Sequence, residues 1–98
     1  MSLITPELIE QVTAANDIVE VIGGDIHLKR LGHLYAALCP FHQESSPSLV
    51  VDPGRQIYKC FGCGQGGSVI AFVMRYENLD FAGAVRKLAG RAGIEFAG

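Results

Sequence analysis

The sequence predicts an α+β fold in which an antiparallel β-sheet is flanked by N-terminal and C-terminal helices. Three observations support this class. Apolar residues recur at helical spacing in about 5–25 and about 68–93, whereas about 26–67 alternates with a period closer to two. Clusters of Gly, Pro, Asp and Ser separate the middle segments. A Cys/His pair and a Cys/Cys pair also lie in this middle part, 17 residues apart, and we predict one domain over 1–98.

Two short helices are predicted in the N-terminal part. Thr5 is placed to cap the first helix, and Pro6 suits its first turn because that position needs no backbone N–H donor. A second helical turn should run from Asp17 through Ile22, where Gly23 ends it. Nothing in this part suggests chemistry, so we expect it to pack over the rest of the chain.

Four strands are predicted in the middle part, over 26–31, 34–38, 48–51 and 56–59. The segment 52–55 has the order Asp-Pro-Gly-Arg, which is typical of a tight turn. The second strand ends at the Cys/His pair and the fourth ends at the Cys/Cys pair. A hairpin around the turn would therefore bring the two pairs together.

Two amphipathic helices are predicted after the sheet. Ser68 and Asp80 are placed as their N-caps. From Phe81 onward, apolar residues fall at i, i+3, i+4, i+7, i+8 and i+11, while Arg and Lys largely occupy the other side. Such a helix usually packs one face on the core and leaves the other in solvent.

The size of the chain favours a cross-linked fold. A chain of 98 residues buries only about 60–65% of its unfolded surface, so a metal would stabilise it usefully. Three cysteines cannot all pair as disulfides, which favours reduced thiols and a cytoplasmic location. No stretch reaches the ~18 apolar residues of a membrane helix, and because the first residues do not show the pattern of a signal peptide, we expect none. We expect no membrane partner.

Charge is unevenly distributed along the chain. The net charge is −2, yet residues 1–25 hold five acids and no Lys or Arg. Residues 26–98 hold all eight bases against five acids, a balance of +3. This pattern allows a basic face, but an ordinary mixed surface explains it equally well.

The strongest functional signal is the pattern Cys39-x2-His42-x17-Cys60-x2-Cys63. Zn²⁺ prefers thiolates and imidazoles at tetrahedral corners, and a two-residue gap lets one tight turn supply two ligands. We therefore predict one structural Zn²⁺, held by these four side chains in a zinc-ribbon sheet. The glycines around the second pair would let backbone N–H groups approach the sulfur atoms. A phosphate-binding loop is the weaker alternative because the P-loop lysine is missing.

With these residues in place, the chain resembles the CHC2 zinc finger, the zinc-binding domain at the N-terminus of bacterial DNA primase. The resemblance covers nearly the whole chain, and its matching runs are Cys39-Pro40-Phe41-His42-x-Glu44-x-x-Pro47-Ser48 and Tyr58-x-Cys60-Phe61-Gly62-Cys63-Gly64-x-Gly66-Gly67. It implies a zinc-ribbon antiparallel sheet with flanking helices. It also implies a role in binding single-stranded template DNA, so that RNA primers begin at preferred short sequences.

The chain departs from the family pattern at three positions. The family commonly has a basic residue and a threonine where Ser45 and Ser46 stand, and phenylalanine where Leu49 stands. Primer synthesis in the family belongs to a downstream catalytic domain of the toprim type, which is absent here. Whether the chain is a fragment or a stand-alone relative, we expect no catalysis from it alone. The resemblance implies the primase catalytic domain, in cis or in trans, as a partner, with the replicative helicase as a further candidate.

Binding of single-stranded DNA needs cations for the backbone and flat side chains for the bases. Strand alternation should place Ile57, Lys59 and Phe61 on one face and Tyr58 and Cys60 on the other. Lys59 beside Phe61 would then form a cation-and-stacking pair. The candidate contacts on the predicted sheet are Lys29, Arg30, Tyr35, Arg55, Tyr58, Lys59 and Phe61.

Structural roles compete with DNA binding at several of these positions. Aromatic rings near zinc ligands more often cover the metal than touch a ligand, which favours a core position for Phe41 and, less strongly, for Tyr35 and Tyr58. For Phe61 the core role and the DNA-binding role are evenly balanced. The alternative for Lys29, Arg30 and Lys59 is that they are ordinary solvated charges.

Two enzymatic hypotheses are weaker. His42 with Glu44 and the second Cys pair imitates the zinc deaminase signature, but Cys39 would occupy the position that such enzymes leave for water. A redox dithiol at Cys60 and Cys63 would need a helix to begin there, and a Gly-rich turn follows instead.

The main alternative is a structural zinc ribbon that docks another protein of the replication machinery, because the fold alone does not decide between the two roles. DNA binding should weaken with salt and on Lys59→Ala or Arg30→Ala. Docking should respond to apolar surface substitutions instead.

Overall fold

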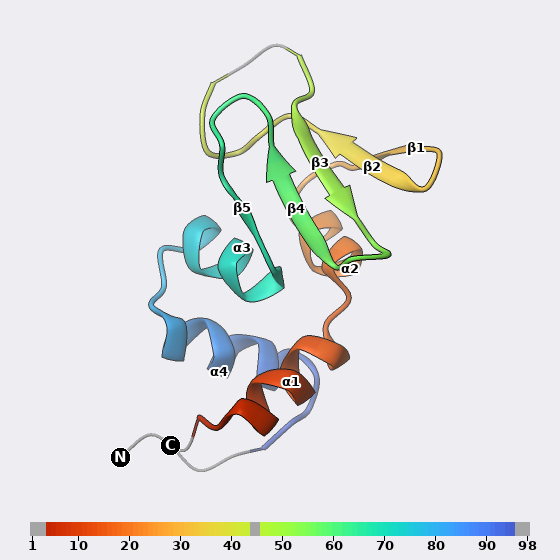
Figure 1. Cartoon of the computed structure of the whole chain (residues 1–98). Helices are drawn as coiled ribbons and strands as arrows, with labels where there is room; N and C mark the ends of the chain where they lie inside the picture. The colour runs from red at the N-terminus through yellow and green to blue at the C-terminus, as the bar shows by residue number, and fades with distance from the viewer. Residues whose placement is uncertain (1–3, 44–45, 96–98) are drawn as a thin grey trace.

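The computed structural model describes residues 4–43 and 46–95, and it confirms the α+β class (Figure 1). Five strands form one antiparallel sheet in the order β1-β2-β3-β4-β5. Helices α2 and α3 pack against β3, β4 and β5, while α1 and α4 lie side by side at the other end of the molecule (Figure 1). The elements are α1 (Pro6–Ala15), α2 (Ile18–Gly23), β1 (Lys29–Leu31), β2 (Leu34–Ala37), β3 (Leu49–Asp52), β4 (Ile57–Cys60), β5 (Gly66–Gly67), α3 (Val69–Tyr76) and α4 (Phe81–Arg91).

The helix starts follow the predicted caps at Thr5, Ser68 and Asp80, and Asp17, predicted as the first residue of the second helix, is the cap of α2. Thr5, Asp17, Ser68 and Asp80 each have extended backbone, and each side chain accepts a hydrogen bond from a backbone N–H of the first turn. Such a cap satisfies one of the donors that a helix start leaves open, and is worth about 1 kcal/mol. All four helices therefore begin where a short polar side chain can reach back to the backbone.

The sheet differs from the prediction at both edges. β1 begins at Lys29 rather than at residue 26. The fifth strand was not predicted, because Gly66 and Gly67 have no side chains to show a pattern. They pair with Lys59 and Tyr58 of β4. A Cβ atom at Gly66 would lie 2.9 Å from the Tyr58 carbonyl oxygen, so the edge strand approaches β4 more closely than a side chain would allow.

The two faces of the sheet have different surroundings. On the inner face, which α2 and α3 cover, Leu49, Val51, Tyr58 and Cys60 are buried in the core. The outer face carries the alternate residues of the same strands, and Ile57, Lys59 and Phe61 are exposed there, as the alternation predicted. One row of paired residues crosses the outer face in the order Lys29, Ala36, Val50, Lys59, Gly66.

Two polar side chains tie distant segments together. The Gln56 side chain donates to Asp17 Oδ1 over 2.8 Å and accepts from the Ile18 N–H over 2.9 Å, which fixes the β3–β4 turn to the start of α2. Buried Asn16 donates to the Leu88 carbonyl oxygen over 3.0 Å and thereby joins α1 to α4. Among the described residues, no helix has the length and hydrophobicity needed to cross a bilayer.

Candidate metal centre

The four predicted ligand residues converge at one end of the sheet. Cys39 follows β2, His42 lies in the next loop, Cys60 ends β4, and Cys63 lies in the turn before β5. Each side chain offers one ligand atom, and these atoms all lie within 4.8 Å of one another. The β3–β4 hairpin therefore brings the two ligand pairs together although 17 residues separate them in the sequence, as the predicted turn implied.

The donor atoms are in near contact. Cys39 Sγ lies 3.8 Å from Cys63 Sγ, and His42 Nε2 lies 3.3 Å from Cys60 Sγ. All three cysteines are free thiols. Cys39 and Cys60 are buried, whereas Cys63 is exposed. One side of the site is thus sealed by the core and the other is open to solvent.

Neighbouring N–H and hydroxyl groups surround the sulfur atoms. The Phe41 N–H donates to Cys39 Sγ over 3.4 Å, and the Gly62 N–H donates to Cys60 Sγ over 3.3 Å. Ser48 Oγ lies 3.4 Å from Cys60 Sγ. Such contacts orient thiolates and lower their charge density. The sequence did not single out Ser48 for this role, because the contact depends on the β3–β4 pairing.

Gly62 also makes room for the imidazole. A Cβ atom at this position would lie 2.8 Å from both Cε1 and Nε2 of His42, and 3.0 Å from Ser48 Oγ. Since real Cβ contacts are essentially never that short, any side chain here would push the His42 ring away from the sulfur atoms. The predicted approach of a glycine N–H group to sulfur is found at the same residue, whose N–H donates to Cys60 Sγ.

The electrostatics of the site favour a divalent cation. Burial raises the pKa of the Cys39 thiol to about 12, and the adjacent Cys60 sulfur adds to that rise. Burial also acts to raise the pKa of Cys60, but hydrogen bonds with Ser48, the Cys63 backbone amide, His42 and Cys39 together outweigh it and lower the pKa to about 6. One ionised sulfur thus disfavours a second one nearby. A divalent ion would relieve this repulsion, so three thiols and one imidazole fit one Zn²⁺.

An aromatic cluster lies beneath the site on the helical side. The Phe41 ring lies 5.7 Å from Phe72 and 6.2 Å from Tyr58, and Tyr58 meets Phe72 edge-on at 5.4 Å between centroids. Phe41 is therefore a packing residue, as expected. The guanidinium carbon of Arg75 lies 5.5 Å from the Phe41 ring centroid. The loop that carries Phe41 is therefore packed against α3 through these side chains.

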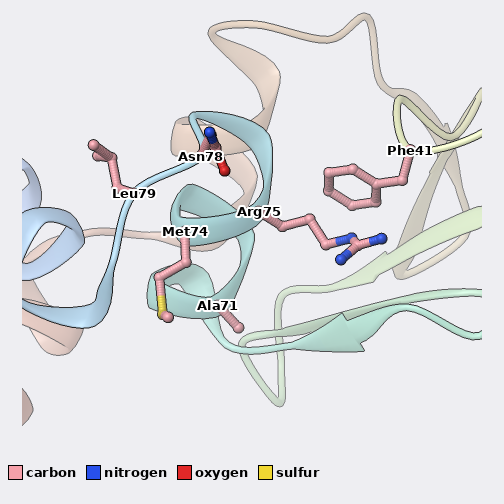
Figure 2. A pocket seen from close by; sticks show the side chains of 6 residues that line it. All are labelled: Phe41, Ala71, Met74, Arg75, Asn78 and Leu79. Atoms are coloured by element: carbon pink, nitrogen blue, oxygen red, sulfur yellow. The ribbon is translucent and has the colours of Figure 1, made fainter.

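A hollow of about 460 Å³ opens beside this cluster (Figure 2). Figure 2 shows Arg75 reaching from α3 towards Phe41, which belongs to the loop between the first two ligands. The residues that line the hollow are Phe41, Ala71, Met74, Arg75, Asn78 and Leu79. The lining of the hollow is therefore largely apolar, with the Arg75 guanidinium as its cation.

Three of the predicted DNA contacts gather on the outer face. Lys29 and Lys59 stand on the same row of paired residues, with Ala36 and Val50 between them. Phe61 follows β4 and is 71% exposed. Lys59 Nζ lies 5.9 Å from the Phe61 ring centroid, so the structure brings together the predicted cation-and-stacking pair.

The other four candidates lie elsewhere. Register places Arg30 and Tyr35 on the row of buried Val51 and Tyr58, which is the inner side of the sheet. Tyr58 is only 3% exposed, so its ring offers no surface for a base. Arg55 lies in the β3–β4 turn, exposed beside Asp52.

Two further sequence features have no structural outcome. Glu44 and Ser45, which the deaminase comparison and the family pattern singled out, lie outside the described residues.

Comparison with known proteins agrees with this architecture. The family model described as CHC2 zinc finger matches residues 4–98. A DNA primase of Clostridium acetobutylicum is 47% identical over 92 residues, which cover 94% of this chain and 15% of that protein. A DNA primase of Thermotoga maritima is 50% identical over 93 residues, covering 95% and 16% respectively. The chain thus spans about one sixth of the length of these relatives.

A solved structure gives the same result. The crystal structure of the zinc-binding and RNA polymerase domains of the Aquifex aeolicus primase superposes with a TM-score of 0.88 and 41% sequence identity. The match covers 92% of this chain and 22% of that one.

Proposed function

The chain belongs to the CHC2 zinc finger family, the zinc-binding domain of bacterial DNA primase, and on that premise we propose that it binds single-stranded template DNA. In this proposal it is non-catalytic alone and helps to select where RNA primers start. Its partners are the template and the primase catalytic domain, and it acts in the cytoplasm, where thiols stay reduced.

The outer face of the sheet is the observation that carries this proposal. Phe61 presents an exposed ring, and Lys59 holds a cation over it at 5.9 Å. A base can stack on the free side of that ring while the ammonium group meets a phosphate. Lys29 stands on the same row as Lys59 and extends the positive charge across the sheet.

The metal has a structural role in this proposal, with Cys39, His42, Cys60 and Cys63 as its ligands. Zn²⁺ supplies a closed tetrahedral cross-link and no open position for a substrate. Phe61 lies between two of the proposed ligands in the chain. The cross-link therefore fixes the backbone that presents the stacking ring.

A priming assay in trans tests the proposal. The catalytic domain of the same primase copies a long single-stranded template with and without this chain, and primer 5′ ends are mapped. We expect added chain to concentrate the starts at a few short sequences, and Lys59→Ala to blunt that effect. Lys87→Ala is the matched control, because it removes the same charge from α4, where Lys87 pairs with Glu77. Start sites that stay unchanged at saturating chain would contradict the proposal.

Docking of another protein is a second candidate function, and the hollow beside α3 favours it. Met74 and Leu79 give this hollow an apolar wall, and Arg75 gives it a cation. We expect Leu79→Ser to weaken binding to the primase catalytic domain while leaving oligonucleotide binding unchanged. The reverse pattern would remove the hollow from consideration.

A further inference from the structure

A second cation and a second flat ring, those of Lys29 and His27, lie near the β1 edge of the sheet, which is the edge away from Phe61. A hollow of about 340 Å³ lies here, where β2 ends, and its lining residues are Ile26, His27, Lys29, Ala36, Ala37, Leu38 and Pro47. Its volume falls in the range of about 300–1,000 Å³ that is typical of small-molecule pockets. Neither His27 nor Lys29 belongs to the proposed metal site.

Strand register connects this hollow to the proposed DNA face. Lys29 and Ala36 head the row that continues through Val50 to Lys59. Leu38 lies two residues beyond Ala36, on the same side of the chain, and it is 51% exposed. Three strand intervals separate Lys29 from Lys59, or about 14 Å at the usual strand spacing. The hollow is therefore separate from the Lys59 and Phe61 pair, but the two are connected along the same face of the sheet.

The lining suits a nucleobase with its phosphate. Leu38 and Pro47 supply apolar walls, against which a base can lie flat. His27 is exposed and supplies ring nitrogens that can donate or accept a hydrogen bond at a base edge. Lys29 supplies a cation for the backbone. Among the interactions of the described residues, none joins the His27 ring or the Lys29 ammonium group to another side chain.

We propose that the hollow at His27 and Lys29 is a second base-binding subsite, which takes an unstacked base of the same single strand that Lys59 and Phe61 bind. This inference rests on the proposed template binding. It assigns His27 as a residue that distinguishes bases, because a hydrogen bond to a base edge depends on the base whereas stacking on Phe61 tolerates all of them.

Abasic scanning of a bound oligonucleotide tests the subsite. The probe is a short single-stranded DNA selected for binding to the intact zinc-loaded chain, with one base removed at a time, and affinity is measured by fluorescence anisotropy. We expect two separate positions at which base removal weakens binding by about 5-fold or more. In His27→Ala one of the two effects should fall below about 2-fold, while the slope of log affinity against log salt stays unchanged.

Two comparison variants make the result specific. His33→Ala is the matched control, because His33 is also exposed but lies in the β1–β2 turn, and it should keep both positions. Lys59→Ala should lower the salt slope by about 1 and retain the His27-dependent position. Zinc content and melting temperature confirm that each variant is folded.

The failures of the two proposals are distinguishable. If His27→Ala keeps both abasic effects while Lys59→Ala weakens binding, the second subsite is rejected and template binding stands. If the unaltered chain binds no single-stranded oligonucleotide at low salt, template binding is rejected and the subsite with it.

Discussion

The inner and outer faces of the sheet are built from the same strands but differ in their surroundings, since the inner side chains are buried and several outer ones are exposed. β4 alternates between them, so that Tyr58 and Cys60 are buried on the face that packs against α3 while Ile57 and Lys59 are exposed. Inner side chains have fixed neighbours, namely sulfur atoms and aromatic rings. Outer side chains have few. A substitution on the inner face should therefore change stability, and one on the outer face should change binding alone.

The largest expected effect is the loss of an inner-face ligand. Cys60→Ser should abolish high-affinity zinc binding and with it most of the folding free energy, since structural Zn²⁺ sites contribute on the order of 10–16 kcal/mol. Zinc content by atomic absorption and thermal melting by circular dichroism measure the two losses. A Cys60→Ser protein that kept one zinc per chain and its melting curve would remove Cys60 from the ligand set.

A smaller effect on the same face should follow from Gly62→Ala. The new methyl group would meet the His42 ring at 2.8 Å, so the imidazole must move and zinc affinity should fall about 10- to 100-fold. Competition with a chromogenic chelator measures this affinity. Gly90→Ala is the control, because its Cβ would meet nothing within 4 Å in the last turn of α4. It should raise stability by no more than about 0.5–1 kcal/mol, the gain expected in a helix interior, and leave the metal unaffected.

On the outer face, Phe61→Ala should weaken binding of a single-stranded oligonucleotide about 5- to 100-fold, because base stacking on an aromatic ring is lost. Zinc content and melting temperature should stay within error. Anisotropy titration and calorimetry give the two numbers. Phe81→Ala removes an exposed ring of the same kind from α4 and should leave binding intact. A Phe61 variant that lost its zinc would show that the two faces are not independent.

The smallest expected effect is that of Lys59→Gln. This change removes one phosphate contact while keeping a long polar side chain, so affinity should fall most at low ionic strength and the salt slope should drop by about 1. A titration series between low and moderate salt measures the slope. An unchanged slope would place the Lys59 ammonium group away from the backbone of the bound strand.

Much of this arrangement follows from local sequence patterns. The spacing of Cys39, His42, Cys60 and Cys63 predicts their convergence because each pair needs only one tight turn. Alternation along β4 places Lys59 beside Phe61 without any knowledge of the neighbouring strands. The helix caps are equally local.

What the sequence could not predict depends on register and on long-range packing. Arg30 was a plausible neighbour of Lys29 on a DNA-binding sheet, but their side chains lie on opposite faces of β1. Only the pairing with β2 and β3 shows which of the two shares a row with Lys59. The contact of Ser48 with Cys60 has the same origin.

Phe61 stands in the middle of a span of backbone that is fixed at both ends. Cys60 belongs to the β-ladder, and the Gly64 N–H donates back to the Cys60 carbonyl oxygen over 2.9 Å, which closes the turn. With Cys60 and Cys63 both bound to a metal ion, the backbone between them would be held rigid and would not move as a free loop. An exposed ring normally loses entropy when a ligand immobilises it. Here the backbone that carries the Phe61 ring would already be rigid before a ligand binds. The degree of that rigidity would depend on how much of the protein holds a metal ion.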